Sequence, residues 1–221
     1  MTQYTPMCEV LSEGDHGRAS LRHLHIGQEE ASYTRMRAVI TGGRDSAVAE
    51  GHYVQLKVGG YLVMSDTPME RRTNANAVRS ATGDVLIAGL GLGMIIIPII
   101  TKPEVTSITV IEKEADVVAL VQPQLVKYLT DKYGESVAAK LKVIVADILE
   151  WKPPKGQKWA TIYFDIWPDI CLDALPEMKT LHRRFGRRKT SPNAYMASWE
   201  RGRLEYESSR QKRARGRYGW Y

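Results

Sequence analysis

The chain has 221 residues, of which 43% are hydrophobic and 25% charged, a balance typical of a soluble globular protein. This composition excludes global disorder and collagen-like or low-complexity classes. The two cysteines, Cys8 and Cys171, give neither a metal-type spacing nor a disulfide framework, so a reducing, cytoplasmic setting is expected. The first residues lack a basic stretch followed by an apolar run, so we expect no secretory signal.

The net charge of +6 is concentrated near the C-terminus, where residues 179–221 carry 13 Lys+Arg and 3 Asp+Glu. Such asymmetry indicates either an anionic partner such as nucleic acid or a solvated basic terminus. Both interpretations stay open at this point.

The first 80 residues indicate short extended pieces separated by turns. Alternating apolar and polar side chains predict strands over residues 21–26, 35–40 and 52–58. Gly59 and Gly60 then favour a hairpin turn into a strand over residues 61–64. Residues 66–79, with Pro68 near their start, are expected to be helical.

From Gly83 onward, apolar strand-like runs alternate with helical segments. Strands are predicted over residues 85–88, 108–111, 141–145, 160–164 and 194–199. Helices are predicted over residues 94–101, 115–133, 136–140 and 175–185, and a proline-rich loop over residues 149–158. This alternation predicts a parallel sheet covered on both faces. Residues 85–101 are uncharged, but their glycines and Pro98 favour a strand, a turn and a helix over a membrane span.

We therefore expect an α/β protein with a Rossmann-like, doubly wound, mostly parallel sheet and a small N-terminal antiparallel β section. The expected division is an N-terminal hairpin section with a connecting helix over residues 1–80. A nucleotide-binding domain would follow over residues 81–200, and a basic tail over residues 201–221.

The central motif is a buried strand that leads directly into Gly89-Leu90-Gly91-Leu92-Gly93 and then into an apolar helix. Glycines let the backbone turn tightly and approach a ligand, and such a loop lies where open α/β sheets bind ligands. The dinucleotide fingerprint requires Gly-x-Gly-x-x-Gly, and its third glycine position is Met94 here. The spacing therefore argues against a nicotinamide dinucleotide.

Acidic residues follow three later strands. Glu112 ends the second strand, about 20 residues after the glycine turn, where a carboxylate can accept ribose hydroxyls. Asp147 and Ile148 follow the third strand and could meet a nucleobase, although Asp147 could equally cap a turn. Asp165 follows the fourth strand and could orient or deprotonate an acceptor, with Trp167 stacking nearby.

In their order, these elements resemble the class I S-adenosylmethionine-dependent methyltransferase superfamily, and most closely its spermidine-synthase-like branch. The resemblance covers about residues 61–199. It implies a cofactor, S-adenosylmethionine or its decarboxylated form, with Asp165 beside the reacting sulfonium. The implied cofactor contacts are Gly89, Leu90, Gly91, Gly93, Glu112, Lys113, Asp147 and Ile148.

The pattern departs from the family in several places, including the segment 64–70, which takes the place of the glutamine-containing stretch of spermidine synthases. Many methyltransferases carry an acid where Ile87 stands, and an acid often found early in the fourth strand is replaced by Ala160. Three functions therefore remain open: a methyltransferase of unknown acceptor, a spermidine-synthase-like aminopropyltransferase, and a non-catalytic cofactor-binding or nucleic-acid-associated module. For aminopropyl transfer the candidate amine-binding acids are Asp66, Asp165 and Asp169.

Other features give weaker predictions. His23 and His25 share a strand face, but no third ligand accompanies them and no metal is expected. The segment 182–189 and the tail are rich in arginine and could bind nucleic-acid phosphates. No membrane partner is expected, and a homodimer is left open. If Glu112 is exposed, its removal should leave stability nearly unchanged.

Overall fold

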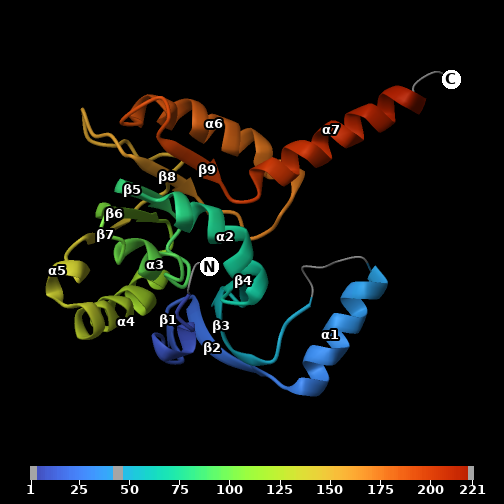
Figure 1. Cartoon of the computed structure of the whole chain (residues 1–221), viewed down its shortest axis with the longest axis horizontal. Coiled ribbons are helices and arrows are strands. Elements are labelled where there is room, and N and C mark those ends of the chain that lie inside the picture. The colour runs from blue at the N-terminus through green and yellow to red at the C-terminus, as the bar shows by residue number, and fades with distance from the viewer. Residues whose placement is uncertain (1–3, 42–46, 219–221) are drawn as a thin grey trace.

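The computed structural model describes residues 4–41 and 47–218, and the side chains of residues 4–40 and 47–213. It contains a four-stranded antiparallel sheet and a five-stranded parallel sheet (Figure 1). The predicted fold class is confirmed: the parallel sheet has the order β7-β6-β5-β8-β9, the arrangement of a doubly wound sheet.

The antiparallel sheet is formed by the N-terminal strands in the order β1-β2-β3-β4. These strands are β1 (Gly14–His16), β2 (Ala19–Ile26), β3 (Gly51–Val58) and β4 (Tyr61–Ser65). The register Val58↔Tyr61 closes the predicted hairpin at Gly59 and Gly60, both of which have positive φ angles. A short 3-10 turn over Met7–Glu9 precedes the sheet.

One predicted strand is wrong. Residues 35–40 belong to helix α1 (Gln28–Thr41). Glu29 and Glu30 in its first turn favour a helix start, because carboxylates complement the partial positive charge of the helix N-terminus. Ala31 and Ala38 are spaced by two helical turns and are both buried, which a two-residue period would not produce.

The parallel sheet and its helices follow in chain order. The strands are β5 (Gly83–Ala88), β6 (Val105–Glu112), β7 (Leu141–Val145), β8 (Thr161–Phe164) and β9 (Tyr195–Ser198). The helices are α2 (Pro68–Ser80), α3 (Ile96–Ile100), α4 (Ala115–Tyr133), α5 (Glu135–Ala138), α6 (Leu175–Phe185) and α7 (Arg201–Tyr218).

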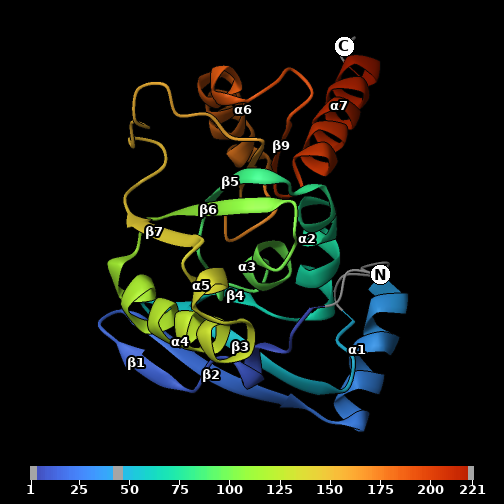
Figure 2. The same cartoon turned by 60° about the vertical axis from the view of Figure 1, so that its left-hand side comes forward.

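Both faces of the parallel sheet are covered, as predicted. Val85 and Ile87 of β5 point into the cluster that contains α3 and α4, whereas Leu86 and Ala88 point into the cluster that contains α6. Figure 2 shows the sheet lying between these two layers. This burial on both faces explains the continuous apolar runs of the strands.

The antiparallel sheet packs against α4 from the side opposite the parallel sheet (Figure 2). Asp116 at the start of α4 accepts a hydrogen bond from the backbone N–H of Arg18 at 2.8 Å. Gln124 of the same helix accepts one from the N–H of Ser12 at 2.8 Å. These contacts place β3 and β4 near the ends of β5 and β6.

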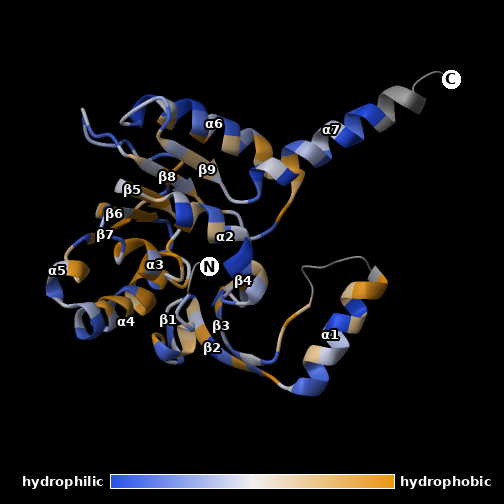
Figure 3. Ribbon diagram, viewed as in Figure 1, coloured by the Kyte–Doolittle hydropathy of each residue, from blue (hydrophilic) through white to orange (hydrophobic). Residues whose placement is uncertain are grey.

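Helix α7 projects from the body and is largely hydrophilic over its described side chains (Figures 1 and 3). Leu204 is its buried anchor, in a cluster with Leu175 and Met178 of α6. The sequence had indicated only a basic tail from residue 201 onward. Among the described residues, no helix combines the length and apolar character needed to cross a membrane.

Candidate functional site

A cavity of about 400 Å³ lies at the carboxyl ends of β5, β6 and β8 and beside the turn that follows β7. Its lining includes Gly89, Leu90, Gly91, Glu112, Lys113, Asp147, Ile148 and Asp165. The sequence analysis assigned Gly93 and these eight residues to the site, and all but Gly93 line the cavity. The position between β5 and β8, where the strand order reverses, is where open α/β sheets bind ligands.

The glycine loop has a backbone that other residues could not adopt without strain. Gly89, Gly91 and Gly93 have φ angles of +98°, +50° and +74°. A Cβ at Gly89 would lie 2.1 Å from the carbonyl oxygen of Asp165, and a Cβ at Gly91 would lie 2.3 Å from Sδ of Met64. Gly93 meets Leu125 of α4 instead, so it is a packing glycine behind the loop.

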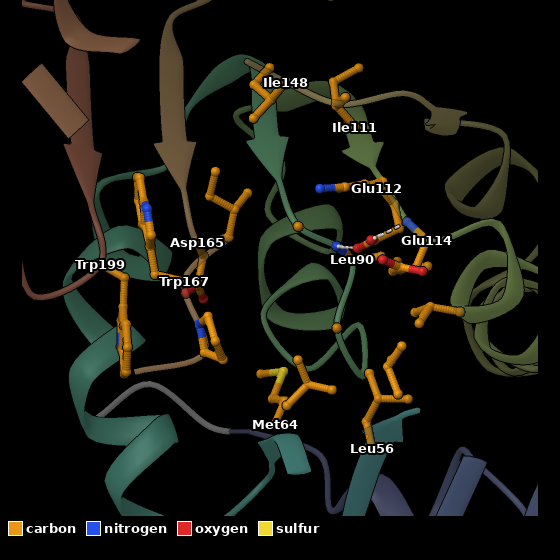
Figure 4. A pocket seen from close by; sticks show the side chains of 18 of the residues that line it. Leu56, Met64, Leu90, Ile111, Glu112, Glu114, Ile148, Asp165, Trp167 and Trp199 are labelled. Atoms are coloured by element: carbon orange, nitrogen blue, oxygen red, sulfur yellow. Dashed lines mark hydrogen bonds between the residues drawn. The ribbon is translucent and has the colours of Figure 1, made fainter. Parts of the chain in front are cut away.

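Glu112 holds this loop in place. It is 9% exposed, and its Oε2 accepts a hydrogen bond from the N–H of Leu90 at 2.7 Å. Its Oε1 accepts a hydrogen bond from the N–H of Glu114 at 2.9 Å, at the start of α4 (Figure 4). Glu112 is thus not exposed, so the condition under which its removal should leave stability nearly unchanged is not met. The carboxylate joins the glycine loop to the start of α4, and Glu112 also lines the cavity.

Asp147 caps the turn after β7 and also lines the cavity, so its contact with a nucleobase stays a prediction. Its Oδ1 accepts a hydrogen bond from the N–H of Leu149 at 2.8 Å, which makes an Asx turn after β7. Its Oδ2 lies 3.5 Å from Nζ of Lys113. Ile148 is 2% exposed and contributes an apolar wall next to this carboxylate.

Asp165 lies at the other end of the cavity with a second carboxylate, Glu70 of α2. Burial raises the pKa of Asp165 to about 8, with a further contribution from Glu70 and an opposing hydrogen bond from Asn74. Burial also raises the pKa of Glu70 to about 7, opposed by a backbone hydrogen bond from Ser65. Pairs of carboxyl groups with shifted pKa values are characteristic of functional sites.

Asn74 is fully buried and orders this end of the cavity. Its amide nitrogen donates to the backbone oxygen of Glu70 at 3.1 Å. Its Oδ1 accepts a hydrogen bond from the hydroxyl of Tyr163 at 2.8 Å. Because Tyr163 belongs to β8, the network ties α2 to the strand that carries Asp165.

Two tryptophans complete the same end of the cavity (Figure 4). The indole Nε1 of Trp167 donates to Oε2 of Glu177 at 2.9 Å. The indole of Trp199, which follows β9, donates to the hydroxyl of Thr73 at 3.0 Å. Figure 4 shows Asp165, Trp167 and Trp199 on one side of the cavity and Glu112 on the other.

The sequence analysis assigned no site role to several lining residues. From the sequence, Glu70 and Trp199 are expected only as parts of a helix and a strand. Leu56, Val58, Val63 and Met64 bring the N-terminal sheet to the cavity as an apolar wall. No local motif could have revealed them, since each reaches the site through long-range packing.

Two predicted acids do not belong to the cavity lining. Asp66 is fully buried, and its carboxylate accepts hydrogen bonds from the N–H groups of Met7 and Val54 at 2.9 and 2.7 Å. It also pairs with Arg71 at 2.9 Å. Asp169 is exposed and does not line the cavity. Of the three candidate amine-binding acids, Asp165 alone lines the cavity.

The histidines and the arginine-rich segment have structural contacts. His23 makes a hydrogen bond of 2.7 Å to the carbonyl oxygen of Leu11, and the described residues contain no cluster that could hold a metal ion. Arg184 donates to the carbonyl oxygens of Leu149 and Trp151. Arg188 bonds the carbonyl of Pro154 at 3.0 Å. Nucleic-acid binding by this segment stays a prediction.

Comparison with known proteins gives distant fold similarities. No family model matches the chain, and no curated protein matches it. Among solved structures, the CcbJ methyltransferase from Streptomyces caelestis is 14% identical, with 57% of this chain and 47% of that chain covered and a TM-score of 0.42. The N-methyltransferase NodS from Bradyrhizobium japonicum is 14% identical, with 57% and 65% covered and a TM-score of 0.41.

A putative methylase from Haemophilus influenzae is 20% identical, with 57% of this chain and 66% of that chain covered and a TM-score of 0.38. The chain thus spans about half to two thirds of the length of these structures. Likenesses this distant carry no argument about chemistry. The function must be argued from the cavity itself.

Proposed function

We propose that the chain is an S-adenosylmethionine-dependent transferase, most simply a methyltransferase. One observation carries this proposal: the glycine loop, Glu112, Asp147 and Asp165 come from four different strand ends, and all line one cavity. A nucleoside with an amino-acid end matches this distribution of polar groups. The glycine loop, Glu112, Asp147 and Asp165 lie at or just after the carboxyl ends of β5, β6, β7 and β8 in turn, and this order supports the same ligand.

The residues fit each part of that cofactor. Glu112 presents carboxylate lone pairs beside the glycine loop, where ribose hydroxyls would donate. Asp147 and Ile148 offer an acceptor and an apolar wall to an adenine ring. Gly89 and Gly91 let the loop pack against Asp165 and Met64 at the cavity edge, where a side chain at either position would collide with them. When bound, the cofactor supplies an electrophilic carbon on its sulfonium.

Asp165 and Glu70 are placed to handle the proton of an acceptor. An amine or hydroxyl that attacks an electrophilic carbon must lose a proton, and a nearby carboxylate can take it. Because burial raises the pKa of Asp165 to about 8, this group is a stronger base when ionised than an ordinary aspartate. A hydrogen bond from Asn74 orients the carboxylate of Asp165.

Aminopropyl transfer is the second candidate, and the charge of the lining favours it. Six acids line the cavity, namely Glu70, Glu112, Glu114, Asp147, Asp165 and Glu177. Lys113 is the single basic residue in that lining, and it pairs with Asp147. Acids outnumber bases in this lining even without Glu70 and Asp165, whose raised pKa values favour their protonated forms near neutral pH. The described lining therefore favours cations and offers no unpaired cation to a ligand carboxylate, which supports a decarboxylated cofactor and an amine acceptor.

Titration calorimetry with S-adenosylhomocysteine tests the shared part of the proposal. We expect binding to the unmodified chain and at least about tenfold weaker binding to Glu112→Gln, since hydrogen bonds to a charged group contribute about 1.5–3 kcal/mol. Glu9→Gln, remote from the cavity, is the matched control and should bind normally. Absence of binding at millimolar ligand would refute methyl transfer, and absence of binding by both S-adenosylhomocysteine and decarboxylated S-adenosylmethionine would refute the whole proposal.

Product analysis separates the two transfers. The chain is incubated with putrescine and either S-adenosylmethionine or its decarboxylated form. Spermidine formed from the decarboxylated cofactor supports aminopropyl transfer, whereas a methylated amine formed from S-adenosylmethionine supports methyl transfer. If the chain binds the cofactor but forms neither product, putrescine is not the acceptor. That result would eliminate the synthesis of spermidine from putrescine.

A further inference from the structure

The connection between β7 and β8 differs from the usual crossover of a parallel sheet. Parallel strands are normally joined by a helix that packs on the sheet. Here residues 151–158 contain no helix or strand, although the connection begins with Asp147 and Ile148 of the cavity wall. This segment therefore needs support from elsewhere in the fold.

The support comes from the end of α6. The guanidinium of Arg184 donates one nitrogen to the carbonyl of Leu149 and the other to the carbonyl of Trp151. One turn later, Arg188 donates to the carbonyl of Pro154 at 3.0 Å. A planar guanidinium presents its donors in a rigid fork, so it fixes the relative position of two acceptors more strictly than an ammonium does.

Aromatic packing reinforces this attachment. The ring of Trp151 stacks on Phe185 with centroids 6.4 Å apart and planes 12° apart. The guanidinium carbon of Arg184 lies 5.2 Å from the same Phe185 ring centroid. The loop is thus fixed at its backbone and at one side chain by consecutive residues of α6.

We propose that Arg184 is a positioning residue for the nucleobase end of the cavity. Arg184 does not itself line the cavity; by fixing Leu149, which does, it holds the turn in which Asp147 accepts the Leu149 N–H. This inference rests on the proposed function, because it assumes that a nucleobase lies against Asp147 and Ile148. It also assigns a role to the arginine-rich segment that does not involve nucleic acid.

The attachment itself can be tested without any ligand. Lys152, Lys155 and Lys158 are exposed on the loop, so limited digestion with a lysine-specific protease reports its order. We expect Arg184→Gln to be cleaved at these lysines several-fold faster than the unmodified chain. Arg183→Gln removes the same charge from an exposed neighbour on α6 and should behave normally. Equal cleavage of both variants would overturn the attachment.

The consequence for the cavity is measured with two ligands that differ at the base. S-adenosylhomocysteine carries an exocyclic amine, and S-inosylhomocysteine carries a carbonyl oxygen there. We expect Arg184→Gln to bind the adenosyl compound about tenfold more weakly, the cost of one lost charged hydrogen bond, and to lose most of its preference for it. Arg184→Lys should recover part of the affinity, and Arg183→Gln should retain all of it.

The outcomes separate the two proposals. If the unmodified chain binds neither ligand while Arg184→Gln is cleaved faster, the proposed function fails and the attachment stands. If Arg184→Gln melts at a lower temperature but keeps both affinity and base preference well below its melting temperature, Arg184 is merely structural. That second result would overturn the positioning role.

Discussion

The carbonyl oxygen of Asp165 occupies the space that a side chain at Gly89 would need, since a Cβ there would lie 2.1 Å from it. The two residues follow neighbouring parallel strands, and the N–H of Asp165 donates to the carbonyl of Ala88 at 2.8 Å. The proposed cofactor loop and the proposed catalytic carboxylate are therefore packed backbone to backbone. A change in one must displace the other.

Gly89→Ala should destabilise the chain strongly. The φ of +98° alone costs an L-residue about 1–2 kcal/mol, and the collision with Asp165 adds to this. We expect a loss of about 3 kcal/mol or more in urea unfolding. Gly156→Ala is the matched control, because its φ is +84° but nothing lies within 4 Å of its Cβ. Equal losses in the two variants would show that the Asp165 contact is unimportant.

Glu112→Ala should reduce stability as well as cofactor affinity. It leaves the buried N–H of Leu90 and the partly buried N–H of Glu114 without their carboxylate acceptor, and an unsatisfied buried donor costs about 1–3 kcal/mol. Chemical denaturation of the ligand-free chain measures this loss. Glu114→Ala removes another lining carboxylate and should cost less than half as much. A fully stable Glu112→Ala would restore the expectation drawn from the sequence.

Much of the fold could be predicted because its pattern is local. The helices over residues 115–133 and 175–185 and the strand over residues 141–145 were predicted with the bounds that the structure shows. The strand predicted over residues 35–40 failed because a six-residue window cannot distinguish alternation from part of a helical period. Its helical start lies seven residues earlier, at Gln28.

The site was predictable only where it follows strand ends. Parallel strands bring Gly89, Glu112 and Asp165 to one edge of the sheet, so their positions in the sequence suffice to group them. Glu70 and Met64 reach the same cavity through α2 and β4, whose packing depends on contacts distant in sequence. Likewise, the structural role of Asp66 follows from Met7 and Val54, which no local spacing connects to it.

Asp66→Ala should destabilise the chain, although Asp66 does not line the cavity and would not contact an acceptor substrate. Its carboxylate is fully buried and paired with Arg71, and loss of one partner of such a pair costs about 3–5 kcal/mol. Asp15→Ala breaks the exposed pair with Arg22 and should cost about 1 kcal/mol or less. Thermal and urea unfolding of both variants measure the difference. Similar small losses would show that Asp66 is not a structural anchor.

The carboxyl pair at Glu70 and Asp165 should make stability depend on pH. In the folded chain their pKa values are raised to about 7 and about 8, from ordinary values of 4.5 and 3.8. The folded state therefore holds protons that the unfolded state has released. The stabilising contribution is complete below about pH 4 and is lost as the pH rises toward 8.

Asp165→Asn isolates this contribution, because the amide has nearly the shape of the protonated acid and cannot ionise. Relative to the unmodified chain, the variant should gain stability as the pH is raised from 4.5 to 8, the interval set by the two shifted groups. Glu70→Gln should show the same trend with a smaller gain. Glu114→Gln, from the Glu112 side of the cavity, serves as the control and should follow the unmodified chain. Urea unfolding at several pH values measures these differences. Parallel stability curves for Asp165→Asn and the unmodified chain would contradict the assignment of a carboxyl group whose pKa is raised by burial at this position.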